Sequence, residues 1–339
     1  MIKYISVHKV GNKLNEESLF LSKKQLSFDK LLESSFSQYF LSSFKTEEYY
    51  RFHHDIDLSM NEVYSCVLAI LDNPKSLQKQ SENIAKHLYN QSVHPKIKGG
   101  EFYVVYFTDC ELNGEILDAV GLFKSENRDT FLEVEQLVDH FEVERRQGIN
   151  INKLDKGCLI YNIKKDDGYI LSIIDNTNKG GEAQYWKDNF LKVLIVNNNF
   201  HQTNQFLGIA KQYVTTQLDE EFEVSKTDKI DLLNRSVEYF KRNDQFDKKE
   251  FEAEVFNSSN IIESFRQFDQ TYRKENEVDL SDNFVISEQA VKKQARVFKS
   301  VLKLDKNFHI YIHGNRELIE QGIDEKGRKY YKIYYENEV

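Results

Sequence analysis

Residues 102–107, Phe102-Tyr103-Val104-Val105-Tyr106-Phe107, consist only of aromatic and β-branched side chains. Such side chains favour extended backbone, and a run of them without a polar interruption is typical of a buried strand. Pro95 and Gly99-Gly100 break the chain just before the run. We therefore predict a buried strand here, as part of an N-terminal sheet with packed helices.

Further strands are predicted on both sides of this run. Ile2–Val10 alternates weakly, and Gly11-Asn12 then provides a turn. Asp166-Asp167-Gly168 has the composition of a hairpin turn between two apolar runs. The strands predicted after residues 102–107 cover residues 119–124, 130–134, 158–163 and 169–174.

Three helices are predicted between the first strand and Pro95. Aromatic residues and leucines recur at helical spacing over residues 28–44, with Ser27 in position to cap the N-terminus. A second helix covers residues 61–71 and stops near Pro74, and a third covers residues 77–89.

From residue 182 the chain reads mainly as helical. Ser287 is placed to cap a short helix that runs from Glu288 towards Phe298, and the chain then returns to strands at residues 308–313 and 330–335. The other segments with 3.6-residue periodicity are 183–194, 202–218, 229–241, 248–256 and 260–274.

These patterns together predict an α+β protein, and its 339 residues favour two or three domains. Residues 1–181 form an N-terminal α+β domain, and residues 182–283 form a helical region that is acidic from residue 219. Residues 284–339 form a basic helix and antiparallel strands that pack with one of these neighbours. Only two prolines occur and no Pro/Gly/Ser-rich linker, so we expect packed and not tethered domains.

The net charge of −9 conceals an uneven distribution of charge along the chain. Counted from the sequence, residues 1–100 carry 13 basic and 11 acidic side chains, residues 219–283 carry 10 and 18, and residues 284–339 carry 11 and 8. An acidic average argues against a general nucleic-acid binder, because affinity comes from neutralising phosphates. The mildly basic C-terminal end is where we expect contact with DNA.

Cysteine usage and hydropathy suggest where the chain resides. Cys66, Cys110 and Cys158 are far apart and form no CxxC pair, which argues against a disulfide framework or a zinc site. The start has no basic and apolar leader pattern, and no apolar run approaches the ~18 residues of a membrane helix. We expect a cytosolic protein with no membrane segment and no cofactor.

Nine short segments form an ordered pattern over nearly the whole chain. They are ISVHKVGN (5–12), SENIAKHLY (81–89), IKGGE (97–101), FKSE (123–126), KGCLIYN (156–162), AQYW (183–186), FL (190–191), FVIS (284–287) and LDKNFHI (304–310). Together they resemble the 37-kilodalton bacterial nucleoid-associated protein family of the NdpA/YejK type. The resemblance implies association with the nucleoid and proximity to DNA. It supplies no catalytic or base-reading residue.

The strongest candidate for DNA contact is residues 291–303. On one helix, Lys292, Arg296, Lys299 and Lys303 would follow the spacing i, i+4, i+7 and i+11 and form a basic stripe, with Lys293 beside it. Such a stripe can follow a phosphate backbone. The alternative is an ordinary solvated helix face, and the stripe is shorter if residues 301–304 are already a strand.

A smaller basic spot lies at Lys96 and Lys98, before Gly99-Gly100. Glycine permits close approach of backbone to an anion. A plain turn that enters the strand is the alternative interpretation.

Two patterns suggest metal chemistry, and both are incomplete. If residues 51–57 form a strand, His53, Asp55 and Asp57 share a face and present N and O ligands, but no partner motif closes the site. Asp118 followed by Lys124 is suggestive of a restriction-type nuclease, but Leu122 occupies the position that needs an acid. We predict no metal site and no catalytic residue.

Tyr185 and Trp186 could stack on bases. Because Phe190, Leu191 and Leu194 continue the same predicted helix, a place in the core is the favoured interpretation, at least for Trp186.

We therefore expect a non-enzymatic, nucleoid-associated protein that binds DNA through local basic faces, which homo-oligomerisation multiplies. The alternative is a protein–protein adaptor whose acidic helical region docks a DNA-processing partner, so that DNA contact is indirect. A metal-dependent nuclease is the second alternative.

Overall fold

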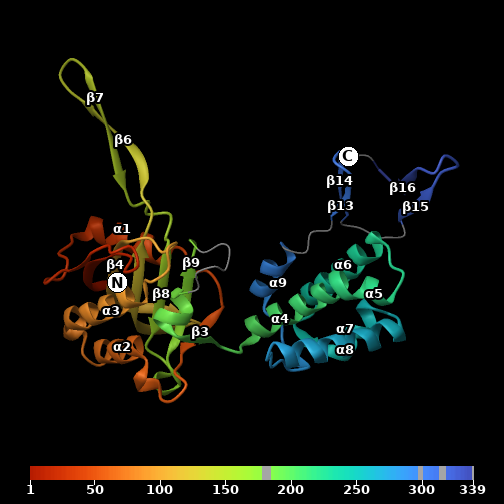
Figure 1. The fold of residues 1–339 in the computed structure, drawn as a ribbon, viewed down its shortest axis with the longest axis horizontal. Helices are drawn as coiled ribbons and strands as arrows, with labels where there is room; N and C mark the ends of the chain where they lie inside the picture. Colours follow the sequence, from red (N-terminus) through yellow and green to blue (C-terminus); the bar gives the residue numbers. More distant parts are fainter. Residues whose placement is uncertain (178–184, 297–300, 313–317, 338–339) are drawn as a thin grey trace. The chain divides into compact units, whose positions relative to one another are not determined.

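The computed structural model describes residues 1–177, 185–296, 301–312 and 318–337. The chain forms two compact units, Met1–Val196 and Asn197–Val339. The first is built on a large sheet and the second on helices (Figure 1). The chain is α+β, as predicted from the sequence.

The sheet of the first unit has eight strands, and each neighbouring pair is antiparallel. Its two longest strands, β4 and β5, lie side by side in the interior of the sheet. In spatial order the strands are β10 (Val193–Ile195), β3 (Tyr49–Phe52), β9 (Ile170–Asp175), β8 (Lys156–Tyr161), β5 (Glu115–Ser125), β4 (Gly100–Leu112), β1 (Ile2–Val10) and β2 (Leu19–Leu21).

The run at residues 102–107 lies within β4 and is buried on both faces, which confirms the prediction. Phe102, Val104 and Tyr106 join a core with α2 (Glu62–Asp72) and α3 (Leu77–Gln91). The alternate residues of β4 join a second core on the opposite face, under α1 (Lys30–Leu41). Helices therefore cover both faces of the sheet (Figure 1).

The helix boundaries follow from side-chain caps. Asn61 caps α2, since its side chain accepts hydrogen bonds from the backbone nitrogens of Val63 and Tyr64. The prediction that Ser27 caps the first helix was wrong. Asp29 does so by accepting a hydrogen bond of 2.8 Å from the backbone nitrogen of Leu32.

The turn between β8 and β9 lies where Asp166-Asp167-Gly168 predicted it. A short 3₁₀ turn, Lys165–Asp167, leads into Gly168, which has φ +93°. A Cβ atom at this position would collide with the carbonyl oxygen of Phe52 on β3. Glycine is therefore required both for the left-handed backbone and for the approach of the neighbouring strand.

The predicted helix over residues 183–194 is only partly present. A π-helical turn covers Trp186–Leu191, and the next residues form β10, which pairs with β3 at one edge of the sheet. Val193, Leu194 and Ile195 are apolar and two of them are β-branched, so pairing with an available strand is favoured over helix.

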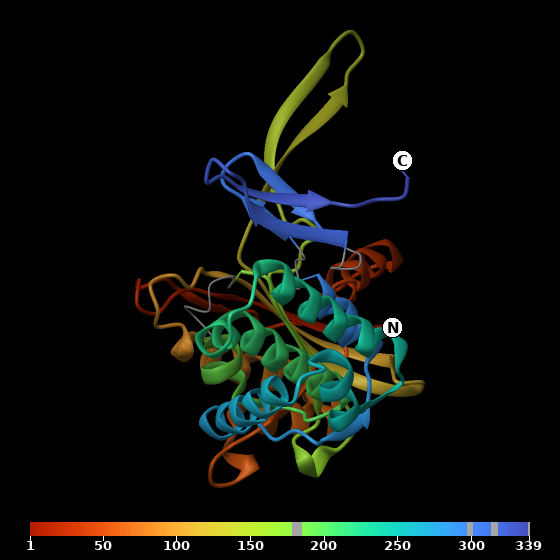
Figure 2. The ribbon, with the colours of Figure 1, turned by 90° about the vertical axis from the view of Figure 1, so that its right-hand side faces the viewer.

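A hairpin of β6 (Asp129–Gln136) and β7 (Phe141–Gly148) extends from the first unit as an arm (Figures 1 and 2). The first of its strands was predicted and the second was not. Glu142, Glu144, Arg145 and Arg146 obscure the apolar alternation of β7.

The second unit packs its helices around a cluster of phenylalanines. The Phe206 ring is 4.3 Å from that of Phe246 and 5.1 Å from that of Phe251, measured between centroids. A pair of short strands, β11 (Gln245–Asp247) and β12 (Asn283–Val285), lies beside this core. The helices are α4 (Asn199–Gln212), α5 (Leu218–Glu221), α6 (Lys226–Arg242), α7 (Lys248–Val255), α8 (Ser259–Glu275) and α9 (Glu288–Ala295), with a π-helical turn at Tyr213–Gln217.

Two hairpins end the second unit. They are β13 (Val301–Leu304) with β14 (Phe308–Tyr311), and β15 (Ile319–Ile323) with β16 (Lys329–Ile333). Leu302 and Ile312 are buried against Ile230 of α6. None of the helices in the described ranges combines the length and apolar character needed to cross a lipid bilayer.

Candidate functional site

The predicted basic helix is shorter than the stripe requires. Helix α9 ends at Ala295 with Arg296 as its C-cap, so Lys292, Lys293 and Arg296 are the cations at this helix. Lys299 lies outside the described residues. Lys303 lies on β13 and not on the helix, so the expectation of one continuous stripe was wrong.

The reason is strand pairing. Val301–Leu304 pairs in register with Phe308–Tyr311, and Asp305 begins the connecting turn with φ +45°. Leu302 points into the small core with Ile230, so the alternate residue Lys303 is exposed.

The cations on α9 already have neighbours within the protein. The Nζ atom of Lys292 is 3.1 Å from a carboxylate oxygen of Glu288, one helical turn earlier. Lys293 lies over the ring of Phe200 at 5.3 Å from its centroid. Binding a phosphate here would compete with these contacts.

Lys303 instead lines a hollow of about 800 Å³ between the two C-terminal hairpins and the start of α6. Two other exposed lysines, Lys226 and Lys329, line it as well. Phe308 and Tyr330 are 60% and 47% exposed at its wall. The remaining lining residues are Leu304, Asp305, Gln321, Gly322, Ile323 and Tyr331.

Among the described residues that line the hollow, Asp305 is the single acidic one against three lysines, which gives this lining a positive charge. Lys226, Lys303 and Lys329 form no ion pair with any residue of the described ranges. Ammonium groups without such a partner can contact phosphates, and the exposed aromatic rings beside them can stack on bases. Sequence reasoning found Lys303 but missed Lys226 and Lys329, because only the packing of α6 against the hairpins brings them together.

The second predicted basic spot is used for contacts inside the protein. Lys96 and Lys98 are exposed, and the Nζ atom of Lys98 donates a hydrogen bond of 2.8 Å to Asn127. A Cβ atom at Gly100 would collide with the backbone of Ser125 on β5. The glycine therefore permits close pairing of β4 and β5, which agrees with the interpretation of a turn that enters a strand.

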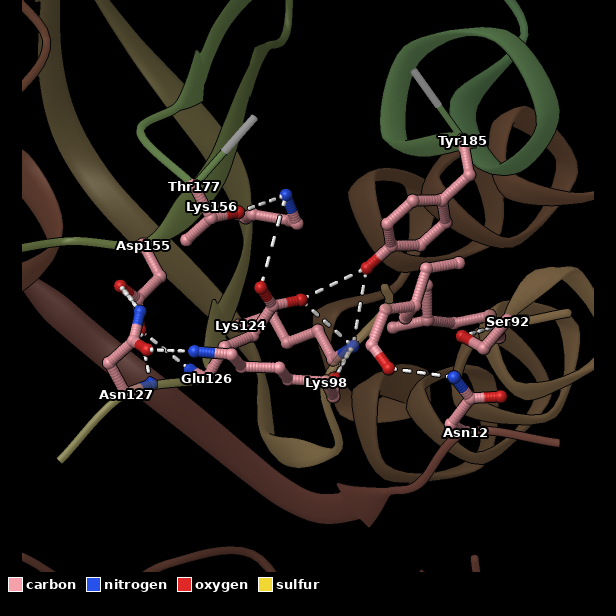
Figure 3. A network of polar contacts seen from close by, with 12 residues as sticks. Asn12, Ser92, Lys98, Lys124, Glu126, Asn127, Asp155, Lys156, Thr177 and Tyr185 are labelled. Carbon is pink, nitrogen blue, oxygen red and sulfur yellow. Dashed lines mark hydrogen bonds and ion pairs between the residues drawn. The ribbon is translucent and has the colours of Figure 1, made fainter. Parts of the chain in front are cut away.

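Lys98 also leads into a buried ionic network at the ends of four strands (Figure 3). Its carbonyl oxygen accepts a hydrogen bond of 2.7 Å from Lys124, which is fully buried. The same ammonium lies 3.1 Å from the carboxylate of Glu126 and 3.2 Å from the hydroxyl of Tyr185. Burial lowers the pKa of Lys124, and the Glu126 carboxylate opposes that shift.

A second buried lysine completes the network. The Nζ atom of Lys156 is 2.6 Å from a carboxylate oxygen of Asp175 and 4.0 Å from one of Glu126. Asp155 accepts hydrogen bonds of 2.6 and 2.8 Å from the backbone nitrogens of Glu126 and Asn127. Two ammonium groups thus face the carboxylates of Glu126 and Asp175, while backbone and Asn127 donors satisfy the Asp155 carboxylate, and together these contacts fix the strand ends.

The nuclease pattern does not gain a metal site from this geometry. Leu122 is fully buried in the apolar core, and Asp118 accepts a 2.6 Å hydrogen bond from Tyr106. Sequence reasoning considered the position before Lys124 and missed Glu126, two residues after it. Among the described residues, no group of three or more His, Cys, Asp or Glu side chains is arranged to hold a metal ion.

The histidine-rich segment at residues 51–57 is not a strand beyond Phe52. His53 lies 3.2 Å from Asp55, and Asp57 accepts a hydrogen bond of 2.8 Å from the backbone nitrogen of Ser59. The three side chains therefore do not share a strand face. Asp57 acts as a helix cap because a short 3₁₀ turn begins directly after it.

Tyr185 and Trp186 are 5% and 0% exposed, so neither offers a ring to an external base. The Trp186 ring packs at 4.9 Å from that of Phe190, between centroids, in the core beneath α2 and α3. The core interpretation is confirmed for Trp186 and also holds for Tyr185.

Five of the nine segments that carry the family resemblance meet at this network. Asn12, Lys98, Lys124, Lys156 and Tyr185 come from five different segments, and the side chain of Asn12 donates 2.7 Å to the carbonyl of Ile97 (Figure 3). A family profile described as nucleoid-associated protein YejK matches residues 6–328. The chain belongs to this family. The family description makes it a nucleoid-associated protein, as expected from the resemblance. No curated protein matches the chain.

Proposed function

We propose that this nucleoid-associated protein binds nucleic acid directly, without catalysis, and that the C-terminal hollow is its main contact surface. The observation that carries the proposal is the hollow lined by Lys226, Lys303 and Lys329 beside exposed Phe308 and Tyr330. Lysines that form no ion pair with another described residue are available to replace the counterions of a phosphate backbone.

The exposed rings favour an unpaired strand as the ligand. Aromatic side chains stack on bases that are not held in a duplex, and each stacked base contributes about 1–3 kcal/mol. Phe308 and Tyr330 come from different hairpins and border the same hollow. We therefore propose single-stranded or locally opened DNA as the preferred form.

The other predicted cations are proposed as weaker, secondary contacts. Lys292 and Lys293 have internal neighbours, and Lys98 is bound to Asn127. Contact with phosphate at these positions must replace an existing interaction, which reduces the net gain. Lys96, Arg296 and Lys299 belong to the same proposed group.

The adaptor alternative draws less support from the acidic helical region. Several of its carboxylates already have basic partners inside the second unit. Asp269 lies 2.7 Å from both Lys248 and Arg273, and Glu252 lies 2.7 Å from Arg266. Fewer carboxylates are therefore open to a basic partner than the count of acidic residues suggests, while the net negative charge of the region is unchanged.

The test is fluorescence anisotropy with a labelled single strand of about 20 nucleotides and the matching duplex, at about 50 and 200 mM salt. Lys226→Gln, Lys303→Gln and Lys329→Gln are combined in the full chain. Each lost phosphate contact on a single strand lowers the slope of log K against log salt by about 0.7, so the triple variant should lose about 2 from the slope.

The control replaces Lys23, Lys75 and Lys165, three exposed lysines of the first unit, by glutamine. It makes the same change in net charge and should leave the slope nearly unchanged. Absence of binding by the native chain at the lower salt would favour the adaptor. Equal losses in both variants would show that the hollow has no special role.

A further inference from the structure

The β6–β7 arm has two chemically different faces. Residues that pair across a hairpin point to the same side of it. Val134 pairs with Val143. Leu132 and Phe141 belong to the two neighbouring pairs on the same face of the hairpin. These four side chains are 59–66% exposed and form a continuous apolar strip along one face.

The opposite face of the arm is acidic. Glu133 pairs with Glu144, and Glu135 pairs with Glu142, so carboxylates lie directly opposite one another. Arg146 forms ion pairs with Glu133 and Glu144, and it is the basic side chain of this face. Six acidic and two Arg residues between 129 and 148 give the arm a charge of about −4, which argues against DNA as its ligand.

The apolar strip has no partner among the residues of the first unit that the structure describes. The arm is a separate two-stranded sheet, and its residues join none of the hydrophobic cores formed by described residues. An isolated two-stranded hairpin is at best marginally stable in water. A continuous apolar strip on such an arm indicates a surface that is covered in use.

We propose that the apolar strip of the arm packs against the same strip of a second copy of this chain. A two-fold axis brings identical patches together, so an apolar strip is complementary to itself. The two arms then form a small sandwich with both acidic faces in solvent, about 10 Å between the sheets.

The charges at the two ends of the strip favour this occupant and an antiparallel arrangement. Arg145 lies beside Leu132 near the base of the arm and forms no ion pair with another described residue. Asp139 lies at the tip, and its carboxylate is exposed apart from its contact with His140. In the antiparallel sandwich, Arg145 of each copy lies opposite the Gln136–Phe141 pair of the other, next to its acidic tip, so the ends are complementary in charge.

The size of the strip sets the expected strength. Strands of 8 residues extend roughly 26 Å, and two of them are about 10 Å wide. Two faces of roughly 26 by 10 Å bury on the order of 500 Å² for both copies, below the range of stable interfaces. We therefore expect a weak, reversible dimer that is strengthened when both copies occupy one nucleic acid.

Cysteine crosslinking in the full chain tests the contact. Val134→Cys places a thiol in the middle of the strip. Glu133→Cys places one at the adjoining residue, on the acidic face of the arm. Background reaction is low, because burial raises the pKa of Cys66 and Cys110 to about 11, and Cys158 is buried. Mild oxidant should link most of the Val134→Cys chains into dimers and few of the Glu133→Cys chains.

Sedimentation analysis at about 1–100 μM provides the second measurement. Because Asp129 and Gly148 pair across the hairpin, residues 130–147 can be replaced by Asn-Gly without moving the strand ends. The native chain should dimerise with concentration and the armless chain should remain monomeric. A monomeric native chain, an armless chain that dimerises equally, or equal crosslinking of both cysteine variants overturns the proposal.

Discussion

Lysines occupy two contrasting environments in the two units of this protein. In the first unit, Lys124 and Lys156 are buried, and each lies close to the carboxylate of Glu126 or Asp175 (Figure 3). In the second unit, the lysines around the C-terminal hollow are exposed and have no ion-pair partner among the described residues.

The difference reflects the cost of desolvation. A buried ammonium loses its hydration and must be matched inside the protein, at a penalty of several kcal/mol per ion if it is not. An exposed lysine keeps its hydration, so leaving it unpaired costs little. Internally matched charge therefore maintains the fold, and unmatched exposed charge is available to a phosphate.

The largest effect is expected from Glu126→Gln, which leaves the buried lysines with one carboxylate fewer. Removal of one member of a buried pair typically lowers the free energy of unfolding by about 3–5 kcal/mol. Trp186 is the single tryptophan and lies in the core of the first unit, so its fluorescence during urea unfolding reports that unit. The exposed Glu133→Gln is the control and should change stability by less than about 1 kcal/mol. If Glu126→Gln and Glu133→Gln have the same free energy of unfolding, the network does not hold the strand ends.

The next effect concerns the rings of the hollow. Phe308→Ala and Tyr330→Ala should each weaken single-strand binding by about 1–3 kcal/mol and leave the salt slope unchanged, because stacking releases no counterions. Anisotropy titrations at two salt concentrations separate this result from that of the lysine variants. Tyr335→Ala is an exposed aromatic control outside the hollow lining. If the control loses as much affinity, the rings do not act as a defined site.

A pH series tests how burial affects an ionisable side chain of the first unit. Burial lowers the pKa of His8 to about 4, and its Nε2 atom lies 2.9 Å from the hydroxyl of Ser81. The unfolded chain binds a proton at His8 more readily than the folded chain. The contribution of neutral His8 to the free energy of unfolding is therefore fully present above pH 6.5 and is lost as the pH falls towards 4. The loss should be on the order of 2 kcal/mol, measured by Trp186 fluorescence. His8→Gln should flatten the pH dependence over this range, while exposed His140→Gln should not.

The smallest effect is expected for Lys292→Gln combined with Lys293→Gln. Both ammonium groups already contact Glu288 or Phe200, so nucleic-acid affinity should fall only roughly two- to fivefold. The measurement is the same anisotropy titration at low salt. A loss larger than that of the hollow triple variant would reverse the assignment and make α9 the main contact surface.

Much of the local structure could be predicted from the sequence. The strand at residues 102–107, the cap of α9 at Ser287 and the turn at Gly168 all follow from side chains within a few residues. The continuous basic stripe through Lys303 was wrong, and the alternative of a strand at residues 301–304 is confirmed, because this segment pairs with Phe308–Tyr311.

The candidate sites depended on longer distances along the chain. Lys303 was a predicted contact, but its neighbours in the hollow lie 77 positions before it, at Lys226, and 26 after it, at Lys329. Glu126 and Tyr185 are 59 residues apart and share a hydrogen bond. No periodic signal connects such positions.

The sequence by itself determined the fold class, the family and the polarity of charge along the chain, because composition and short-range periodicity express these properties directly. The tertiary structure alone decided which lysines are buried with carboxylates, which surround an open hollow, and which face of the arm is apolar. Those outcomes depend on strand register and helix packing, where a one-residue change moves a side chain from core to solvent. Chemically identical lysines thus acquire different roles through burial.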